Sequence, residues 1–166
     1  AALAEIADGP TTGLARASLQ SCRAHGGRTG IITGGTAWKP IIEDLLLTEG
    51  CTPFAAGVRT IAASGGQATH TPRQTIDALR HEADILIRHH GADRILIAGA
   101  GLAGFNAALA TDLPVPVHCS VDESLRWIAA GIPDHTPPAR AAVDTTGLSR
   151  DLADLLDGRT APRPCC

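Results

Sequence analysis

Three short segments of the chain contain residues that could bind a ligand or transfer a proton, and two of them are rich in glycine. They are Thr33-Gly34-Gly35-Thr36, Ala98-Gly99-Ala100-Gly101 and His118-Cys119-Ser120. Each lies at the end of a short run that predicts a β-strand. Ligands of open α/β sheets bind beyond the carboxyl ends of the strands, so the three segments are candidates for one shared site.

The first segment suits a negatively charged ligand. Gly34 and Gly35 let the backbone approach a ligand closely, and the free N–H groups of the following helix favour an anion. The hydroxyl groups of Thr33 and Thr36 could bind a carboxylate. The same residues also fit an ordinary strand-to-helix turn in which Thr36 caps the helix, so both interpretations stay open.

The third segment contains a candidate acid or base. Cys119 stands beside His118 at a predicted strand end, and the N-terminus of the following helix could favour its thiolate. Cysteine is also among the residue types most often buried as small apolar side chains. The sequence leaves both roles open for Cys119.

The second segment matches the spacing of a dinucleotide-binding fingerprint. Gly99, Gly101 and Gly104 form G-x-G-x-x-G directly after a predicted strand. The fingerprint also requires an acidic residue after the next strand, but that strand is expected to end at His118-Cys119. NAD binding is therefore the weaker alternative for this segment.

Composition excludes several classes of protein. The 166 residues suit a single domain, and 14 Lys plus Arg against 17 Asp plus Glu give a net charge of −3, which argues against a nucleic-acid-binding protein. No apolar run approaches the roughly 20 residues that span a bilayer, and no signal segment opens the chain, so we expect no membrane association and a cytoplasmic location. The cysteines contain no C-x-x-C pair, so neither a disulfide framework nor a metal site is expected; they are Cys22, Cys51, Cys119, Cys165 and Cys166.

The remaining histidines offer no recognisable motif. His81, His89 and His90 lie on one predicted helix at a spacing that fits no strong metal motif, and we expect them to be exposed. His70 and His135 are expected in loops. We therefore assign no function to these side chains.

Alternation of β-rich runs with amphipathic helices predicts an α/β fold with a parallel sheet flanked by helices. Strands are expected at 29–33, 54–61, 94–98 and 115–119. Helices are expected at 11–25, 38–48, 72–90, 102–110, 121–130 and 148–156, with a loop at 64–67 and a disordered tail at 158–166. The run RILIA at 94–98 is wholly apolar inside, as in strands buried on both faces.

Four of these segments are similar to the aspartate/glutamate/hydantoin racemase family, and most of all to its hydantoin racemase branch. They read GRTGIITGGTAWKPIIEDLL, GCTPFAAGVRTI, GADRILIAGAGLAG and VPVHCSVDESLRWIAAG. The similarity runs from about Pro10 to Gly131. It depends on the order and spacing of the segments, because no single motif decides it.

This resemblance implies two similar α/β lobes with flavodoxin-like layering and an active site in the cleft between them. It implies no cofactor and a small-molecule substrate: an amino acid, a hydantoin or a related small carboxylate. In the family, one cysteine thiolate removes the α-proton and a second thiol returns a proton on the opposite face. Two opposed groups are needed because inversion requires proton exchange on both faces.

The chain departs from the family pattern at both cysteines. The first would lie in a segment before Ala1, and Gly99 stands at the position of the second. Gly99 cannot transfer a proton, so Cys119, one strand away, is the candidate for a displaced acid or base. The residues expected to bind the substrate are those of the turn that holds the carboxylate and those of the opposite wall: Thr33, Gly34, Gly35, Thr36, Gly99, Ala100 and Gly101.

The resemblance also suggests how the chain is divided. We expect the remnant of a preceding helix at 1–10, a complete lobe at 11–98, parts of a second, incomplete lobe at 99–135, and a Pro-rich tail with one short helix at 136–166. An incomplete lobe would expose a sheet edge, so a homo-oligomer is expected. Two functions remain open: a cofactor-independent racemase with altered chemistry, and a non-catalytic domain that binds small acids.

Overall fold

The computed structural model describes residues 11–63, 65–131 and 146–156. Residues 13–132 form one compact unit, and residues 1–12 and 133–166 form another. The described part of the second unit contains helix α8 (Arg150–Leu156), which lies within the helix expected at 148–156. Expectations for 1–10, for His135 and for 158–166 lie outside the described residues.

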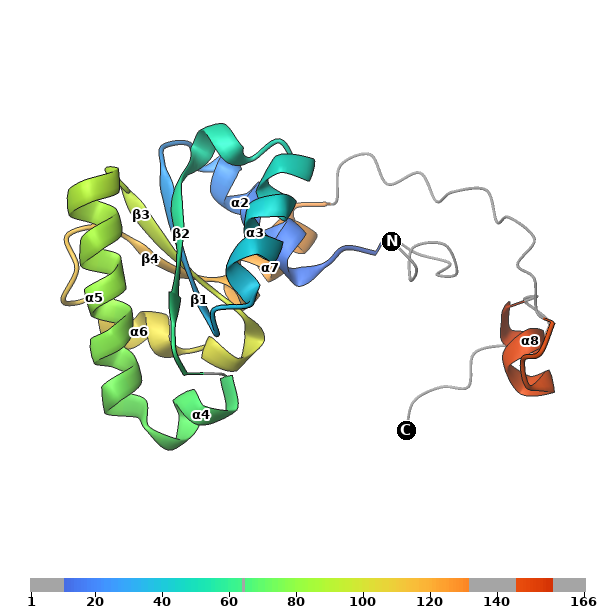
Figure 1. Cartoon of the computed structure of the whole chain (residues 1–166). Helices are drawn as coiled ribbons and strands as arrows, with labels where there is room; N and C mark the ends of the chain where they lie inside the picture. Colours follow the sequence, from blue (N-terminus) through green and yellow to red (C-terminus); the bar gives the residue numbers. More distant parts are fainter. Residues whose placement is uncertain (1–10, 64, 132–145, 157–166) are drawn as a thin grey trace. The chain divides into compact units, whose positions relative to one another are not determined.

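The larger unit is built on a parallel sheet with helices on both of its faces (Figure 1). Within the described residues the strand order is β2-β1-β3-β4, and every neighbouring pair is parallel. The strands are β1 (Thr29–Gly34), β2 (Ala55–Ile61), β3 (Arg94–Ala98) and β4 (Val117–Cys119). The α/β fold with a helix-flanked parallel sheet is therefore confirmed.

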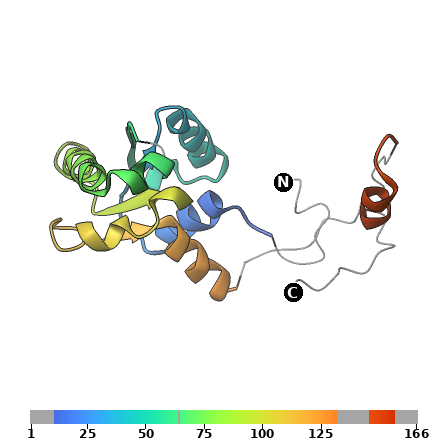
Figure 2. The ribbon, with the colours of Figure 1, turned by 90° about the horizontal axis from the view of Figure 1, so that it is seen from below.

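Helices cover the sheet in two layers, which separate clearly in the view from below (Figure 2). One layer contains α2 (Leu14–Ala24), α3 (Trp38–Thr48) and α7 (Ser120–Ala129), and α2 packs along α7. The other layer contains α5 (Pro72–His90) and α6 (Phe105–Leu109). Shorter elements are η1 (Thr52–Phe54), α4 (Gly65–His70) and η2 (Ala100–Leu102).

Two apolar clusters hold the layers together, one on each face of the sheet. Ile31 and Leu96 face α2 and α3, whereas Ile32 and Ile97 face α5. Both central strands, β1 and β3, are thus buried on both sides, which explains why RILIA at 94–98 is apolar without alternation. Close packing of α5 against β1 favours glycine at position 30, because a Cβ there would lie 3.0 Å from side-chain atoms of Ile95 and Leu86.

Three local expectations were wrong. The segment expected as a loop at 64–67 begins helix α4, in which Ala68 is buried and its carbonyl accepts a hydrogen bond from Thr75 Oγ1, so tertiary packing offsets the low helix propensity of its glycines. The helix expected at 102–110 begins only at Phe105, because Leu102 ends η2, Ala103 is extended and Gly104, with φ of +90°, is the N-cap of α6. β4 starts at Val117 because Pro116 has no N–H to donate.

Strand β4 pairs with β3 in the same sheet as β1 and β2. The division expected between residues 98 and 99 stays a prediction. The larger unit runs from residue 13 to residue 132. The segments after β1, β3 and β4 consequently meet at one edge, as the strand-end argument predicts.

In the described part of the chain, no helix is both long and apolar enough to span a bilayer. The longest, α5, is amphipathic and exposes His81, His89 and His90, as expected. His70, at the end of α4, is exposed as well.

Candidate functional site

A cavity of about 360 Å³ lies at the carboxyl ends of β1 and β3. Its walls come from the ends of these two strands, from the segment after β3 and from the N-terminal parts of α2, α3, α4 and α7. The lining residues are Leu14, Ala15, Thr33, Gly34, Trp38, Ile42, Gly65, Ala98, Gly99, Ala100, Gly101, Leu102 and Ser120. Most are apolar or glycine, and the polar side-chain atoms among them are the hydroxyl groups of Thr33 and Ser120 and the indole N–H of Trp38.

The structure brings most of the predicted binding residues together at this cavity. Thr33 and Gly34 end β1, and residues 99–101 follow the neighbouring strand β3, in which Ala98 pairs with Thr33. Gly35 and Thr36 are not among the lining residues; Gly35, with φ of +81°, donates its N–H to the Ile61 carbonyl at 2.9 Å. Thr36 is exposed and does not cap α3, whose N-cap is Ala37 without a side-chain hydrogen bond.

Cys119 does not line the cavity. It is 2 % exposed and pairs with Ile97, which packs in the cluster beneath α5. Because side chains alternate along a strand, Cys119 shares the face of Ile97, opposite to the face of Thr33 and Ala98. Of the two interpretations of Cys119, its position favours the small buried residue.

Ser120 occupies the place that the sequence interpretation gave to Cys119. It is the first residue of α7, is 1 % exposed, and its Oγ accepts a hydrogen bond from the Gly99 N–H at 3.2 Å. The register of β3 and β4 places it beside Ala98. The sequence could have indicated this, because successive side chains along 117–120 point to opposite faces of the sheet, so Cys119 and Ser120 cannot both face the cavity.

Gly99 adopts a backbone conformation that glycine alone adopts readily, with φ of +112° and ψ of 130°. A Cβ at this position would lie 3.9 Å from Thr33 Oγ1, so a side chain would have room beside the cavity. Gly101 differs, because a Cβ there would lie 2.6 Å from Gly65 Cα. The backbone conformation at residue 99 and the close approach of residue 101 to Gly65 therefore both depend on glycine.

Gly99→Ala should lower the free energy of unfolding by about 1–3 kcal/mol, the usual cost of a strained backbone conformation. Gly66→Ala is the matched control. Gly66 lies in α4, no atom lies within 4 Å of where its Cβ would be, and the change should be neutral or stabilising by up to about 1 kcal/mol. Urea denaturation measures both variants, and equal losses of stability would contradict the strain at Gly99.

The geometry after Gly99 does not fit a dinucleotide. The fingerprint requires an α-helix whose N-terminus faces the pyrophosphate. Here Gly99 is followed by the 3₁₀ turn η2, and α6 begins only at Phe105 and has five residues. Gly99, Gly101 and Gly104 lie in a bent connection instead, so this geometry argues against the NAD interpretation.

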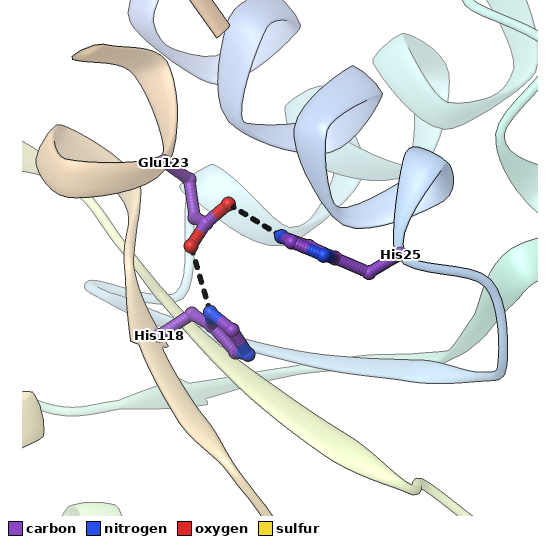
Figure 3. Close-up of side chains that lie close together, drawn as sticks. All are labelled: His25, His118 and Glu123. Carbon is purple, nitrogen blue, oxygen red and sulfur yellow. Dashed lines mark hydrogen bonds and ion pairs between the residues drawn. The ribbon is translucent and has the colours of Figure 1, made fainter. Parts of the chain in front are cut away.

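A second polar centre lies between α2, β4 and α7, away from the cavity lining (Figure 3). Glu123 is fully buried, His118 Nδ1 lies 2.7 Å from its Oε1, and His25 Nε2 lies 3.3 Å from its Oε2. Ser21 donates its hydroxyl to Oε2, and Arg126 pairs with Oε1. Sequence reasoning missed this centre, because His25 and Glu123 lie 98 residues apart and no short motif connects them.

Burial alone would raise the pKa of the Glu123 carboxyl. Hydrogen bonds from Ser21 and His118, with the charges of His118 and Arg126, outweigh burial and lower the pKa from 4.5 to about 2. The two neighbouring buried thiols behave differently: burial raises the pKa of Cys22 to about 12 and also raises that of Cys51. Neither thiol lines the cavity, and neither is a ready nucleophile or base.

We expect the Glu123 carboxylate to make the stability of the fold sensitive to acid. Since its pKa is lower in the folded than in the unfolded protein, it stabilises the fold above about pH 4.5, and this stabilisation is lost as the pH falls towards 2. A shift of this size corresponds to about 3 kcal/mol. Urea midpoints measured across this window should fall steeply for the wild type and less for Glu123→Gln. Parallel pH profiles would contradict the assignment.

The sequence of the chain matches a known protein family. The family model described as Asp/Glu/Hydantoin racemase matches residues 1–126. Hydantoin racemases from Pseudomonas sp. (strain NS671) and Rhizobium meliloti are each 28% identical to the chain, over 113 and 126 residues. These matches cover 68% and 76% of this chain but 45% and 52% of the relatives, so the chain spans about half the length of the curated relatives it matches.

Two solved structures share the fold. The allantoin racemase from Pseudomonas fluorescens superposes with a TM-score of 0.71 at 22% identity, covering 78% of this chain and 57% of that one. The allantoin racemase from Klebsiella pneumoniae gives a TM-score of 0.77 at 20% identity, covering 93% of this chain and 64% of that one. Since the family model extends over most of the chain and confirms the resemblance found in the sequence, the chain belongs to the Asp/Glu/hydantoin racemase family.

Proposed function

We propose that the cavity beside Thr33, Gly99 and Ser120 binds a hydantoin or a related small carboxylate, and that the chain carries part of a cofactor-independent racemase reaction at the α-carbon. The observation that carries this proposal is the position of the cavity. It lies at the two turns that resemble the substrate-binding turns of the family, 33–36 and 99–101. The relatives and structural neighbours named above are hydantoin and allantoin racemases, which supports the same class of substrate.

The lining suits a small molecule with one polar edge. Leu14, Ile42 and Leu102 offer apolar contacts to a ring or side chain, while Thr33 and Ser120 offer hydroxyl groups. Ser120 is also the first residue of the ten-residue helix α7, whose N-terminal end carries partial positive charge. A carboxylate, or the oxygen of a hydantoin that gains negative charge when the α-proton leaves, would be stabilised at this end of the cavity.

Proton transfer needs a group that the cavity of this chain does not supply. Its lining includes no cysteine, histidine or carboxylate among the described residues. Gly99 stands where the family has a cysteine, and Cys119 faces the other side of the sheet. We therefore propose that this chain binds substrate well and exchanges its α-proton slowly, with weakened chemistry. A second candidate function is a domain that binds small acids without catalysis. The absence of an acid or base from the described lining favours it.

Exchange of the α-proton in deuterated water separates these possibilities. The full chain is incubated with each enantiomer of a 5-substituted hydantoin and, separately, with aspartate and glutamate. Proton NMR then records loss of the α-proton signal, and saturation-transfer difference records binding. Binding with exchange slightly above a protein-free blank is the expected result, and binding with no exchange would establish the binding-only alternative. If none of these compounds bound, both functions would be wrong.

A further inference from the structure

Two imidazoles and one carboxylate converge in the polar centre between α2, β4 and α7. One ligand atom from each of His25, His118 and Glu123 lies within 4.8 Å of the other two. The two rings lie 5.5 Å apart between centroids, and each presents a nitrogen to the Glu123 carboxylate (Figure 3). The three side chains come from three separate elements, so the fold itself creates this arrangement.

This set of donors is one that divalent transition metals prefer. Neutral imidazole nitrogens and a carboxylate oxygen bind Zn²⁺ at about 2.0–2.2 Å, with water completing the coordination. Two nitrogens and one oxygen also suit other first-row divalent cations. A neutral histidine loses no proton on binding, because the hydrogen moves to its other ring nitrogen by exchange with solvent. A protonated histidine releases one proton.

The surroundings support a metal ion more than they oppose it. The Ser21 hydroxyl and the Arg126 guanidinium hold the two carboxylate oxygens of Glu123, as outer partners commonly fix a ligating carboxylate. The Arg126 charge opposes a cation, but its side chain is 61% exposed and solvent screens it. Exposure increases from Glu123 at 0% through His118 at 18% to His25 at 45%, which leaves an approach from solvent on the His25 side.

We propose that His25, His118 and Glu123 bind a divalent transition-metal cation, for which Zn²⁺ is the probe. The bound ion would connect the end of α2 to β4 and α7. Both helices also line the cavity, α2 through Leu14 and Ala15 and α7 through Ser120. The ion would therefore stabilise the walls of the cavity from a distance and take no part in proton transfer. This site does not depend on the function proposed for the cavity.

Titration calorimetry of the full chain with Zn²⁺ tests the proposal. The measurements use a Cys165→Ser/Cys166→Ser background, because two adjacent thiols could bind Zn²⁺ themselves. We expect one ion per chain, and at least about a tenfold loss of affinity in His25→Ala and in His118→Ala. His81→Ala is the matched control, an exposed histidine on α5, and it should leave the affinity unchanged.

Two further readouts separate a metal site from a structural role. Zn²⁺ should raise the melting temperature of the background protein and not that of His25→Ala, and Co²⁺ should give visible ligand-field bands that His25→Ala abolishes. Because His25 is nearly half exposed, this variant should fold even if His118→Ala does not. Absence of stoichiometric Zn²⁺ binding, or equal affinity in the background protein and His25→Ala, would overturn the proposal.

Discussion

Gly99→Cys should raise the rate of α-proton exchange at a bound hydantoin by about 100-fold, the lower range of what a positioned acid or base contributes. The reason is position: a side chain at 99 would begin 3.9 Å from Thr33 Oγ1, beside the cavity. The thiolate would remove the α-proton, exchange with solvent, and return deuterium to the same face. One thiol serves one face, so deuterium uptake should occur without loss of optical activity and for one enantiomer only. Proton NMR and polarimetry on the same sample measure both quantities.

Gly99→Ser is the matched control for this variant. Serine has nearly the size of cysteine and suffers the same strain at a φ of +112°, but its hydroxyl is a far weaker acid. Its exchange rate should stay at the level of the wild type, and its stability should match that of Gly99→Cys. If both variants exchanged equally, or if Gly99→Cys bound hydantoin without faster exchange, position 99 would not face the α-carbon.

Ala15→Phe should weaken hydantoin binding on the order of 100-fold, or about 2.7 kcal/mol. Ala15 lies in the first turn of α2 and lines the cavity, and it is only partly buried. A phenyl ring there would occupy much of the roughly 360 Å³ that a ligand needs, without creating a hole in the core. Calorimetric titration with a 5-substituted hydantoin measures the loss.

Ala24→Phe, an exposed position in the last turn of the same helix, is the control. It adds the same ring to α2 but lies outside the cavity lining, so it should leave hydantoin affinity unchanged. Thermal melting checks that both variants remain folded. Unimpaired binding by a folded Ala15→Phe would show that the ligand occupies another place.

The sheet was predictable because its central strands are short runs of mostly apolar residues. RILIA at 94–98 and TGIIT at 29–33 are apolar on both faces, a pattern that double burial imposes, and both became strands within one residue of the expected ends. The amphipathic pattern of 72–90 and the proline in its first turn likewise predicted α5 with the correct ends. The expectation failed at α4, where packing around Ala68 stabilises a helix that its glycines disfavour.

The site was predictable in part. Thr33 lies near the end of β1, and the glycines at 99 and 101 follow its neighbour β3, so the strand-end rule alone brings them together. Cys119 was selected for its chemistry, yet strand alternation turns it away from the cavity and gives the position to Ser120. The Glu123 centre was not predictable, because it depends on how α2 packs on α7, which no local pattern encodes.

The central claim is that the cavity at the ends of β1 and β3 binds a hydantoin or a related small carboxylate. The most direct test is a titration of the ¹⁵N-labelled full chain with a 5-substituted hydantoin, followed by backbone amide shifts. We predict saturable shifts centred on Thr33, Gly99 and Ser120, with the amides of α5 and of the C-terminal end of α2 unmoved. Absence of shifts at these three residues, or saturable shifts centred on the opposite face beneath α5, would contradict it.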